Sequence, residues 1–384
     1  MREFDEIRPY NDCEVPEVIG RMIADNELID LLLEDLFSGA GKLLYPWLRP
    51  LLRARLRYTS RKIVTVDMLQ QHLAIRLKTI LDQTTDGYSF SGLSGIENDK
   101  SDVFMSNHRD IALDPAITVL GLVESGSDSL RIAIGDNLLS KPFASDLMRI
   151  NRSFIVKRSV VARREKLKAL KILSNYIRQS VCNEGISVWI AQAEGRAKDG
   201  RDRTETALLK MLALSRSKDQ DFSSAINELN IVPVSISYEY DPCDADKARE
   251  LYIAKTGKSY VKTAFEDLET IKKGFIGYKG RVHVHYGSPC KIANIGAENL
   301  AADIDDQIFC GYRLFPSNIV AWQMLYDSLD VTELKHCWPD EDWFVAHAKF
   351  EKRIEALPEK HRDIVVQAYA SPVTDQLSSS HHRA

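Results

Sequence analysis

Residues 103–115 read VFMSNHRDIALDP, and this segment indicates the fold class more clearly than any other part of the chain. Its first three residues are apolar, as in a buried strand, and a polar turn follows that holds a histidine, an arginine and two aspartates. A carboxylate that orients a histidine can make the ring a general base near neutral pH. Because α/β sheets gather their chemistry at the ends of strands, the segment predicts an α/β fold and a candidate catalytic site together.

The polar turn is also compatible with a structural role or with a kinase loop. A histidine beside an aspartate is more often part of a turn or a helix cap than a catalytic pair. The triplet His108-Arg109-Asp110 also occurs in the catalytic loop of protein kinases. However, the chain has no glycine-rich loop, no Val-Ala-Ile-Lys strand and no Asp-Phe-Gly triplet where a kinase needs them. The sequence therefore excludes a kinase.

Three further blocks adjoin apolar, strand-like runs later in the chain. Residues 154–158 read FIVKR, and residues 193–201 read AEGRAKDGR directly after an apolar run. Residues 231–238 read IVPVSISY and predict a buried strand. In this order, the four blocks resemble those of the glycerolipid acyltransferase superfamily, which includes lysophosphatidic acid and glycerol-3-phosphate acyltransferases.

The resemblance implies a catalytic pair of His108 and Asp114, with Asp110 as an alternative partner for the ring. Five residues separate His108 from Asp114, where the family usually has four, and Gly195 is followed directly by Arg196, where the family usually has one residue between them. This variant spacing is similar to that of some bacterial members. We favour Asp114, because the family tends to carry serine at the position of Asp110. The resemblance also implies substrate contacts from Asn107, Arg109, Lys157, Arg158, Glu194, Gly195 and Arg196.

The implied reaction moves a fatty acyl group from an acyl thioester to a hydroxyl of a lysophospholipid or of glycerol-3-phosphate, a step in phospholipid biosynthesis. His108 would remove the hydroxyl proton during the attack. Arg158 and Arg196 offer planar donors that match phosphate oxygens. The chain lacks the G-x-S-x-G motif of a serine nucleophile. Direct transfer is therefore the better hypothesis.

Two alternative functions stay open at this point. The altered spacings around His108 and Arg196 are compatible with a catalytically silent lipid-binding or membrane-adaptor protein of the same fold. An acyltransferase that acts on an amino-lipid or a sugar-lipid is the other alternative. The cations of the second and third blocks favour an acceptor that carries a phosphate.

The wider sequence pattern predicts four regions. An α/β domain over residues 87–296 has a mixed, mostly parallel sheet flanked by helices, because short apolar runs alternate there with helical periodicities. A helical region over residues 1–86 precedes this domain, and a second helical region over residues 297–376 follows it. Residues 377–384 predict a disordered tail.

Composition restricts the class of protein further. The 384 residues carry a net charge of −4, which gives no support to nucleic-acid binding. The six cysteines have no C-x-x-C spacing, which argues against a zinc ribbon and suits a reducing cytoplasm. His283 and His285 could share a strand face, but no third ligand is apparent, so we predict no metal. We also predict no cofactor beyond the acyl donor itself, acyl-CoA or acyl-acyl carrier protein.

The N-terminal region predicts a peripheral membrane contact. Residues 43–57 read LLYPWLRPLLRARLR, in which aromatic and aliphatic residues mix with arginines. Such a segment can lie on a bilayer surface with its cations on anionic headgroups, or it can be a core helix with a solvated basic face. No apolar run approaches the roughly 20 residues that a spanning helix needs. We therefore expect a cytoplasmic protein that associates with the inner face of the membrane.

Overall fold

The computed structural model describes residues 2–37, 44–97, 99–139, 141–263, 265–326 and 331–383. The chain forms two compact units, and neither of them is continuous in sequence. One unit contains Met1–Leu77 and Arg131–Tyr176, and the other contains Lys78–Leu130 and Ile177–Ala384. The second unit includes the His108 turn and is described first.

Five strands of the second unit form a mixed, mostly parallel sheet in the order β1-β7-β6-β2-β5. The β6–β7 pair is antiparallel, and the other three pairs are parallel. This arrangement confirms the predicted fold class. The strands are β1 (Tyr88–Ser91), β2 (Val103–Ser106), β5 (Val188–Ala191), β6 (Ile231–Tyr238) and β7 (Val282–Tyr286).

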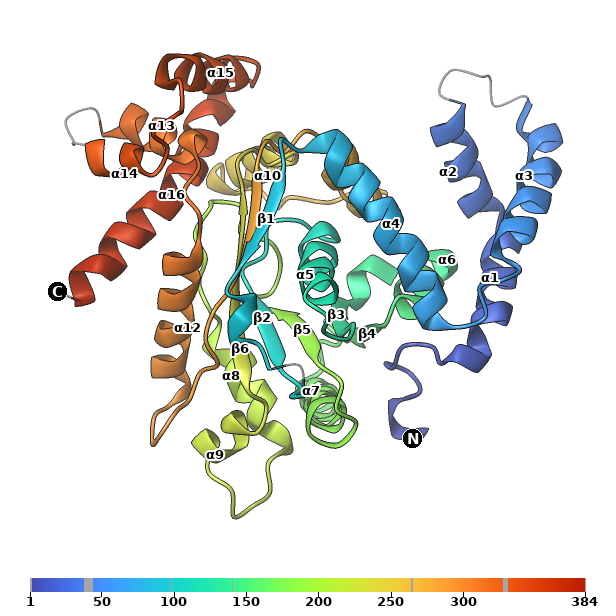
Figure 1. Cartoon of the computed structure of the whole chain (residues 1–384). Coiled ribbons are helices and arrows are strands. Elements are labelled where there is room, and N and C mark those ends of the chain that lie inside the picture. The colour runs from blue at the N-terminus through green and yellow to red at the C-terminus, as the bar shows by residue number, and fades with distance from the viewer. Residues whose placement is uncertain are drawn as a thin grey trace. The chain divides into compact units, whose positions relative to one another are not determined.

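The apolar runs of the sequence form the inner strands of this sheet. Every residue of β2, β5 and β6 is buried, as expected for parallel strands that are covered on both faces. Figure 1 shows α5 (Leu113–Glu124) on one side of the strands, and α8 (Thr206–Leu212) and α12 (Ala297–Gly311) on the other. The shorter helices of this region are α9 (Phe222–Asn227), α10 (Asp244–Lys255) and α11 (Glu266–Ile276).

The C-terminal part of the second unit is helical, as the sequence predicted. Its helices are α13 (Pro316–Leu325), α14 (Thr332–His336), α15 (Trp343–Glu355) and α16 (Glu359–Arg383). They share a core in which Phe350 of α15 and Val373 of α16 are fully buried. The structure differs from the predicted tail at residues 377–384, because α16 continues to Arg383. The hydroxyl of Ser379 donates to the Asp306 carboxylate of α12 at 3.0 Å, which attaches this last part of the helix; residue 384 lies outside the described residues.

The first unit contains the N-terminal helices and two parallel strands. Val15 and Val18 pack with Val66 and Ile150 in one core cluster. A second cluster joins α2 to α3 through Ile29, Leu33 and Tyr45. The elements are α1 (Val15–Ala24), α2 (Asn26–Leu36), α3 (Tyr45–Ser60), most of α4 (Val66–Thr84), β3 (Arg131–Gly135), α6 (Pro142–Ile150), β4 (Ser153–Val156) and most of α7 (Arg163–Arg178).

No helix of the described residues is both long and apolar enough to cross a membrane. The predicted interfacial segment, residues 43–57, corresponds to α3 and the residue before it, while residue 43 lies outside the described residues.

Candidate active site

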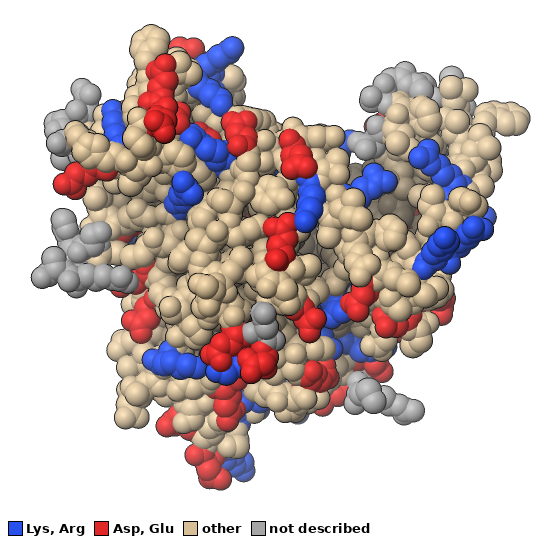
Figure 2. Space-filling model, in the orientation of Figure 1, with Lys and Arg blue, Asp and Glu red and all other residues tan. Residues whose placement is uncertain are grey.

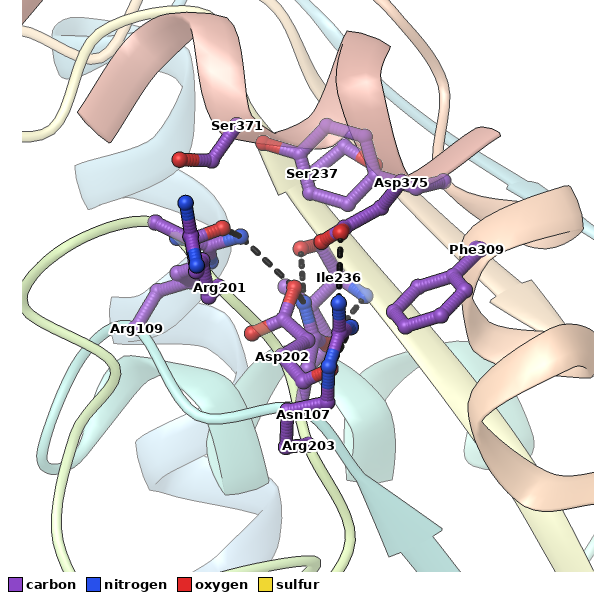
Figure 3. Close-up of polar contacts among 12 residues, drawn as sticks. Asn107, Arg109, Arg201, Asp202, Arg203, Ile236, Ser237, Phe309, Ser371 and Asp375 are labelled. Atoms are coloured by element: carbon purple, nitrogen blue, oxygen red, sulfur yellow. Dashed lines mark hydrogen bonds and ion pairs between the residues drawn. The ribbon is translucent and has the colours of Figure 1, made fainter. Parts of the chain in front are cut away.

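The polar turn between β2 and α5 is attached to the neighbouring strand by Asn107. The Ile236 amide of β6 donates to Asn107 Oδ1 at 2.8 Å, and Asn107 Nδ2 donates to the Ile236 carbonyl at 3.0 Å. The same Nδ2 also donates to the carboxylate of Asp202 at 3.1 Å (Figure 3). Asn107 is completely buried. Its amide therefore fixes the position of the turn, and the substrate contact implied for Asn107 stays a prediction.

The next residue, His108, contacts the carboxylate of Asp114. His108 Nδ1 lies 2.9 Å from Asp114 Oδ2. Asp114 is in the first turn of α5, where the helix dipole favours a negative charge, and it is fully buried. Oδ2 also accepts the backbone amides of Arg109 at 2.6 Å and Asp110 at 2.9 Å. The ring is thus held by a carboxylate that is itself held by the turn.

This contact determines which nitrogen of His108 can act as a base. A carboxylate is an acceptor, so Nδ1 carries the proton and donates it to Asp114. Nε2 is then the unprotonated nitrogen, and it has no hydrogen-bond partner among the described residues. The ring packs edge-on against Trp189 of β5 with 5.7 Å between centroids, and 14% of the side chain remains exposed. The arrangement suits removal of a proton from a bound hydroxyl.

Asp110 has a different role from Asp114. Its Oδ1 accepts the backbone amides of Ala112 at 3.0 Å and Leu113 at 2.8 Å, so that it closes the turn that leads into α5. Burial and the nearby negative charge of Asp114 raise the pKa of Asp110 to about 6. Of the two carboxylates left open by the sequence, the structure therefore places Asp114 on the ring.

Arg109 connects the turn to the loop that follows β5. Its Nη2 donates to the Gly200 carbonyl at 3.0 Å and to Asp202 at 2.6 Å (Figure 3). Lys247 of α10 in turn donates to the Arg109 carbonyl at 2.7 Å. Arg109 is 9% exposed. These internal acceptors occupy its Nη2, so Arg109 holds the loop in place, whereas its buried Nε has no hydrogen-bond partner among the described residues. The substrate contact implied for Arg109 stays a prediction.

The loop after β5 brings the third sequence block next to His108. The Ala197 amide donates to the His108 carbonyl at 2.8 Å, and the Glu194 amide donates to the Glu205 carboxylate at 3.2 Å. Gly195 has a φ of +85°, which glycine adopts without strain. Arg196 Nη1 is buried and has no hydrogen-bond partner among the described residues. A buried cationic donor without an acceptor is what an anionic ligand would complete.

Lys157 and Arg158, of the second sequence block, belong to the first unit. Lys157 forms an ion pair with Glu6. The Arg158 amide donates to the Asp136 carboxylate at 3.0 Å, which fixes the backbone after β4. The substrate contacts implied for Lys157 and Arg158 stay predictions.

Two residues that support the site were not predicted from the sequence. The Tyr238 hydroxyl donates to Asp114 Oδ1 at 2.8 Å, and Asp202 binds both Asn107 and Arg109. A signal for Tyr238 existed, because a tyrosine at the end of a buried strand needs a partner for its hydroxyl. Asp202 stands among cations in the stretch KDGRDR, where nothing local distinguishes it from a surface charge.

A small polar cavity borders the same turn. It has a volume of about 40 Å³ and is lined by Arg109, Tyr238, Asp241, Lys247 and Tyr312, among others. This volume accommodates a few water molecules and is far too small for a fatty acyl chain.

The histidine pair that was considered as a metal site makes other contacts. The His283 ring bonds with the hydroxyls of Ser89 at 2.8 Å and Ser91 at 2.9 Å, and His285 bonds with Ser91 at 2.8 Å. Across the described part of the chain, no group of three or more His, Cys, Asp and Glu side chains is placed to hold a metal ion.

Comparison with known proteins identifies the domain that contains this site. Residues 88–237 match the family model described as Acyltransferase. This segment, with the His108 turn inside it, is an acyltransferase domain. The match confirms the resemblance to the glycerolipid acyltransferase superfamily that the four sequence blocks indicated.

Individual relatives are distant. The search of curated proteins found no match to this chain. The similar solved structures include the 1-acyl-sn-glycerophosphate (LPA) acyltransferase PlsC from Thermotoga maritima, which is 16% identical, with 66% of this chain and 79% of that chain covered and a TM-score of 0.35.

Proposed function

We propose that the chain transfers a fatty acyl group from an acyl thioester to a hydroxyl of a lysophospholipid or of glycerol-3-phosphate. The observation that carries the proposal is the 2.9 Å contact between His108 Nδ1 and the fully buried Asp114, inside the acyltransferase domain. A ring held in this way presents an unprotonated Nε2, and an alcohol needs such a base to attack a thioester at neutral pH.

The proposed reaction needs no covalent enzyme intermediate. His108 Nε2 accepts the hydroxyl proton while the alcohol oxygen attacks the thioester carbonyl carbon, and Asp114 stabilises the charged ring. The tetrahedral intermediate then breaks its C–S bond. The departing thiolate takes the proton back from Nε2, so that an ester and a free thiol leave and the ring is neutral again.

The phosphate of the acceptor is proposed to bind Arg196. This side chain has a buried Nη1 without a partner among the described residues, and it adjoins Ala197, whose amide bonds to His108. A guanidinium can bind two phosphate oxygens in parallel. Coenzyme A or an acyl carrier protein would bring the acyl group as a co-substrate, and we propose no further cofactor.

Helix α3 is proposed to contact the membrane that holds the lipid substrates. Its inner stripe packs on α2, whereas Trp47, Leu51 and Tyr58 are 78%, 67% and 65% exposed. Large apolar and aromatic side chains of this kind insert at the headgroup boundary of a bilayer. Figure 2 shows basic residues on the α2–α3 end of the first unit, as contact with anionic lipid requires.

Two arginines of α3 serve the fold itself. Arg49 forms a bidentate pair with Asp30 at 2.7 and 2.6 Å, and Arg53 donates to the Ile23 carbonyl at 3.1 Å. The exposed Arg55 and Arg57 are therefore the cations that we propose for the headgroups. In this proposal the protein is cytoplasmic and lies peripherally on the inner face of the membrane.

A substrate screen tests the proposed reaction. Purified protein receives acyl-CoA or acyl-acyl carrier protein together with lysophosphatidic acid, glycerol-3-phosphate, an amino-lipid or a sugar-lipid, and mass spectrometry identifies the lipid product. We expect esterification of a phosphate-bearing acceptor and its loss, by at least about a thousandfold, in His108→Ala. The control is His347→Ala, which removes an exposed histidine of α15.

The outcomes of this screen are distinct. Turnover that survives in His108→Ala refutes the general-base mechanism. If only the amino-lipid or the sugar-lipid is acylated, the proposed phosphate-bearing acceptor is refuted, and the acylated lipid is the acceptor. Vesicle binding without acyl transfer to any acceptor refutes the proposed reaction and supports a lipid-binding adaptor.

A further inference from the structure

The Asp114 carboxylate has one donor from outside its own turn and its own helix. His108, Arg109 and Asp110 all bond to Oδ2, whereas Oδ1 accepts the Tyr238 hydroxyl at 2.8 Å. No other donor reaches Oδ1 among the described residues. Because the carboxylate is fully buried, no bulk water can replace a donor that is lost.

Tyr238 is held in this position by the sheet. It is the last residue of β6, and β6 pairs with β2 on one side and with β7 on the other. The two bonds between Asn107 and Ile236 connect the end of β6 to the catalytic turn. The side chain is 6% exposed, so the phenol has little freedom to turn away from Asp114.

We infer that Tyr238 is a positioning residue of the acyl transfer, which acts through Asp114 and sets the orientation and basicity of the His108 ring. The inference rests on the proposed function, and it adds a third member to the His108–Asp114 pair. The phenol does not touch the reacting atoms. It holds the far oxygen of the carboxylate, so that Oδ2 stays directed at Nδ1.

The phenol can only donate in this contact. Burial and the negative charge of Asp114 raise the pKa of Tyr238 well above its ordinary value, so the hydroxyl keeps its proton. A hydrogen bond to a carboxylate spreads its negative charge and lowers its basicity. Without that bond, Asp114 attracts the proton of Nδ1 more strongly and favours the charged ring.

Other charged groups surround Tyr238 and Asp114. Asp110 and Asp241 act on Tyr238 electrostatically, and Asp114 and Asp202 act on Arg109. The set of nearby titratable groups on the packed elements comprises Arg109, Asp110, Arg196, Asp202, Asp241, Cys243, Lys247, Lys279 and Tyr312.

Tyr238→Phe and Tyr286→Phe form a matched pair of variants for the test. Each removes one hydroxyl from a buried tyrosine of neighbouring strands, but the Tyr286 hydroxyl donates to the Thr118 carbonyl at 2.6 Å and not to Asp114. Thermal unfolding of both variants measures the structural cost of a lost buried hydrogen bond. A structural role alone predicts that the two variants behave alike in catalysis.

We expect Tyr238→Phe to lower kcat about tenfold, with KM for the acceptor changed less than threefold. The acidic limb of the profile of kcat/KM against pH should move up by about half a pH unit or more. Tyr286→Phe should leave kcat and this limb unchanged. In an Asp114→Asn background, Tyr238→Phe should have no further effect on kcat, because the phenol acts through that carboxylate.

A second measurement does not depend on activity. The ring of His108 is titrated by NMR, with its signal assigned by its absence in His108→Ala, and its pKa should rise in Tyr238→Phe but not in Tyr286→Phe. If the wild-type protein shows no acyl transfer, the proposed function is refuted. The titration of the His108 ring then still tests the inference on Tyr238. Identical ring titrations and identical kcat in the two variants would overturn the inference, whatever the substrate.

Discussion

At the residue scale, the catalytic turn shows how much a single short segment can specify. His108 was identified as a candidate base from its residue type and its place after an apolar strand, and the family resemblance made Asp114 the preferred partner, with Asp110 left open. The choice between Asp110 and Asp114 depends on backbone geometry, since Asp110 is occupied by the amides of Ala112 and Leu113. Tyr238 is 124 residues away from Asp114 along the chain, so the pairing could not be seen in the sequence.

Asp110 makes the stability of the protein depend on pH. Its pKa is raised from 3.8 to about 6 in the folded protein, so the folded state holds a proton that the unfolded state has released between these values. The contribution of Asp110 to the free energy of unfolding is therefore fully present below about pH 4, and it is lost as the pH rises through about 6. Asp110→Asn keeps an acceptor for the two amides and removes the titration.

We expect the thermal midpoint of Asp110→Asn, relative to the wild type, to be several degrees higher at pH 8 than at pH 4.5. Differential scanning fluorimetry at the two pH values measures this. Asp199→Asn, in an exposed loop, provides the control for a lost surface charge. If the thermal midpoints of Asp110→Asn and the wild type differ by the same amount at both pH values, the raised pKa of Asp110 is contradicted.

Arg196 should determine affinity for the acceptor phosphate. Replacement of a charged donor to phosphate costs about 1.5–3 kcal/mol, so we expect Arg196→Gln to raise KM for a phosphate-bearing acceptor about tenfold or more. The KM for the acyl donor should change little. Arg201→Gln removes an exposed arginine of the same loop and serves as the control. If both variants raised KM for the acceptor equally, the overall positive charge of the loop, and not the buried donor of Arg196, would determine the affinity.

At the element scale, the strands were predictable where they are apolar on both sides. β2, β5 and β6 coincide with largely apolar runs, because a strand covered on both faces has few polar positions. β1, with the sequence YSFS, was missed because two of its four residues are serines, whose hydroxyls bond with the histidines of β7. The helical end of α16 was also missed, because its contact with Asp306 comes from a distant helix.

Helix α3 provides a prediction about membranes. Trp47→Ala combined with Leu51→Ala removes two exposed apolar side chains, and we expect about tenfold weaker binding to vesicles of anionic and zwitterionic lipid. Cosedimentation with vesicles measures the binding. Phe344→Ala, on α15, removes a side chain that is 85% exposed and provides the control. Unchanged binding of the double variant refutes the contact through α3.

At the scale of the whole molecule, α16 of the C-terminal region holds the loop that carries Arg196. Arg203 forms an ion pair with Asp375 of α16 at 2.8 Å (Figure 3), and the Ser371 hydroxyl donates to the Asp199 carbonyl at 2.9 Å. Gly200 packs so closely on Ala368 that a Cβ at this position would collide with the Ala368 carbonyl. The acyltransferase domain therefore depends on residues far beyond its own C-terminal end.

Gly200→Ala tests this dependence. Gly200 has a φ of +76° and Gly257 has a φ of +75°. Of these two glycines, Gly200 has no space for a methyl group, whereas Gly257 does. Both alanine variants lose about 1–2 kcal/mol from the left-handed backbone. We expect Gly200→Ala to lower the thermal midpoint and kcat/KM clearly more than Gly257→Ala, because the loop has to move away from α16. Equal losses in the two variants contradict a tight contact.

The segments that make up each of the two units could not be predicted from the sequence pattern. Hydrophobic periodicity is local, so it predicts the helices of the N-terminal region and the strands β3 and β4 separately. It contains no information that Ile150 completes the core cluster of Val15 and Val18. Pairings between distant segments depend on the shapes of the packed surfaces, which a single sequence does not display.

The discontinuous first unit has a consequence for synthesis of the protein. Val15 and Val18 share their core with Val66 and Ile150, so α1 leaves the ribosome long before Ile150, the last member of this cluster, has been made. During this interval the nascent chain exposes the apolar faces of its first helices, together with Trp47 and Leu51. The rate at which residues 88–150, from β1 to α6, are translated therefore sets how long a chaperone or a bilayer can bind the nascent chain before the first unit can fold completely.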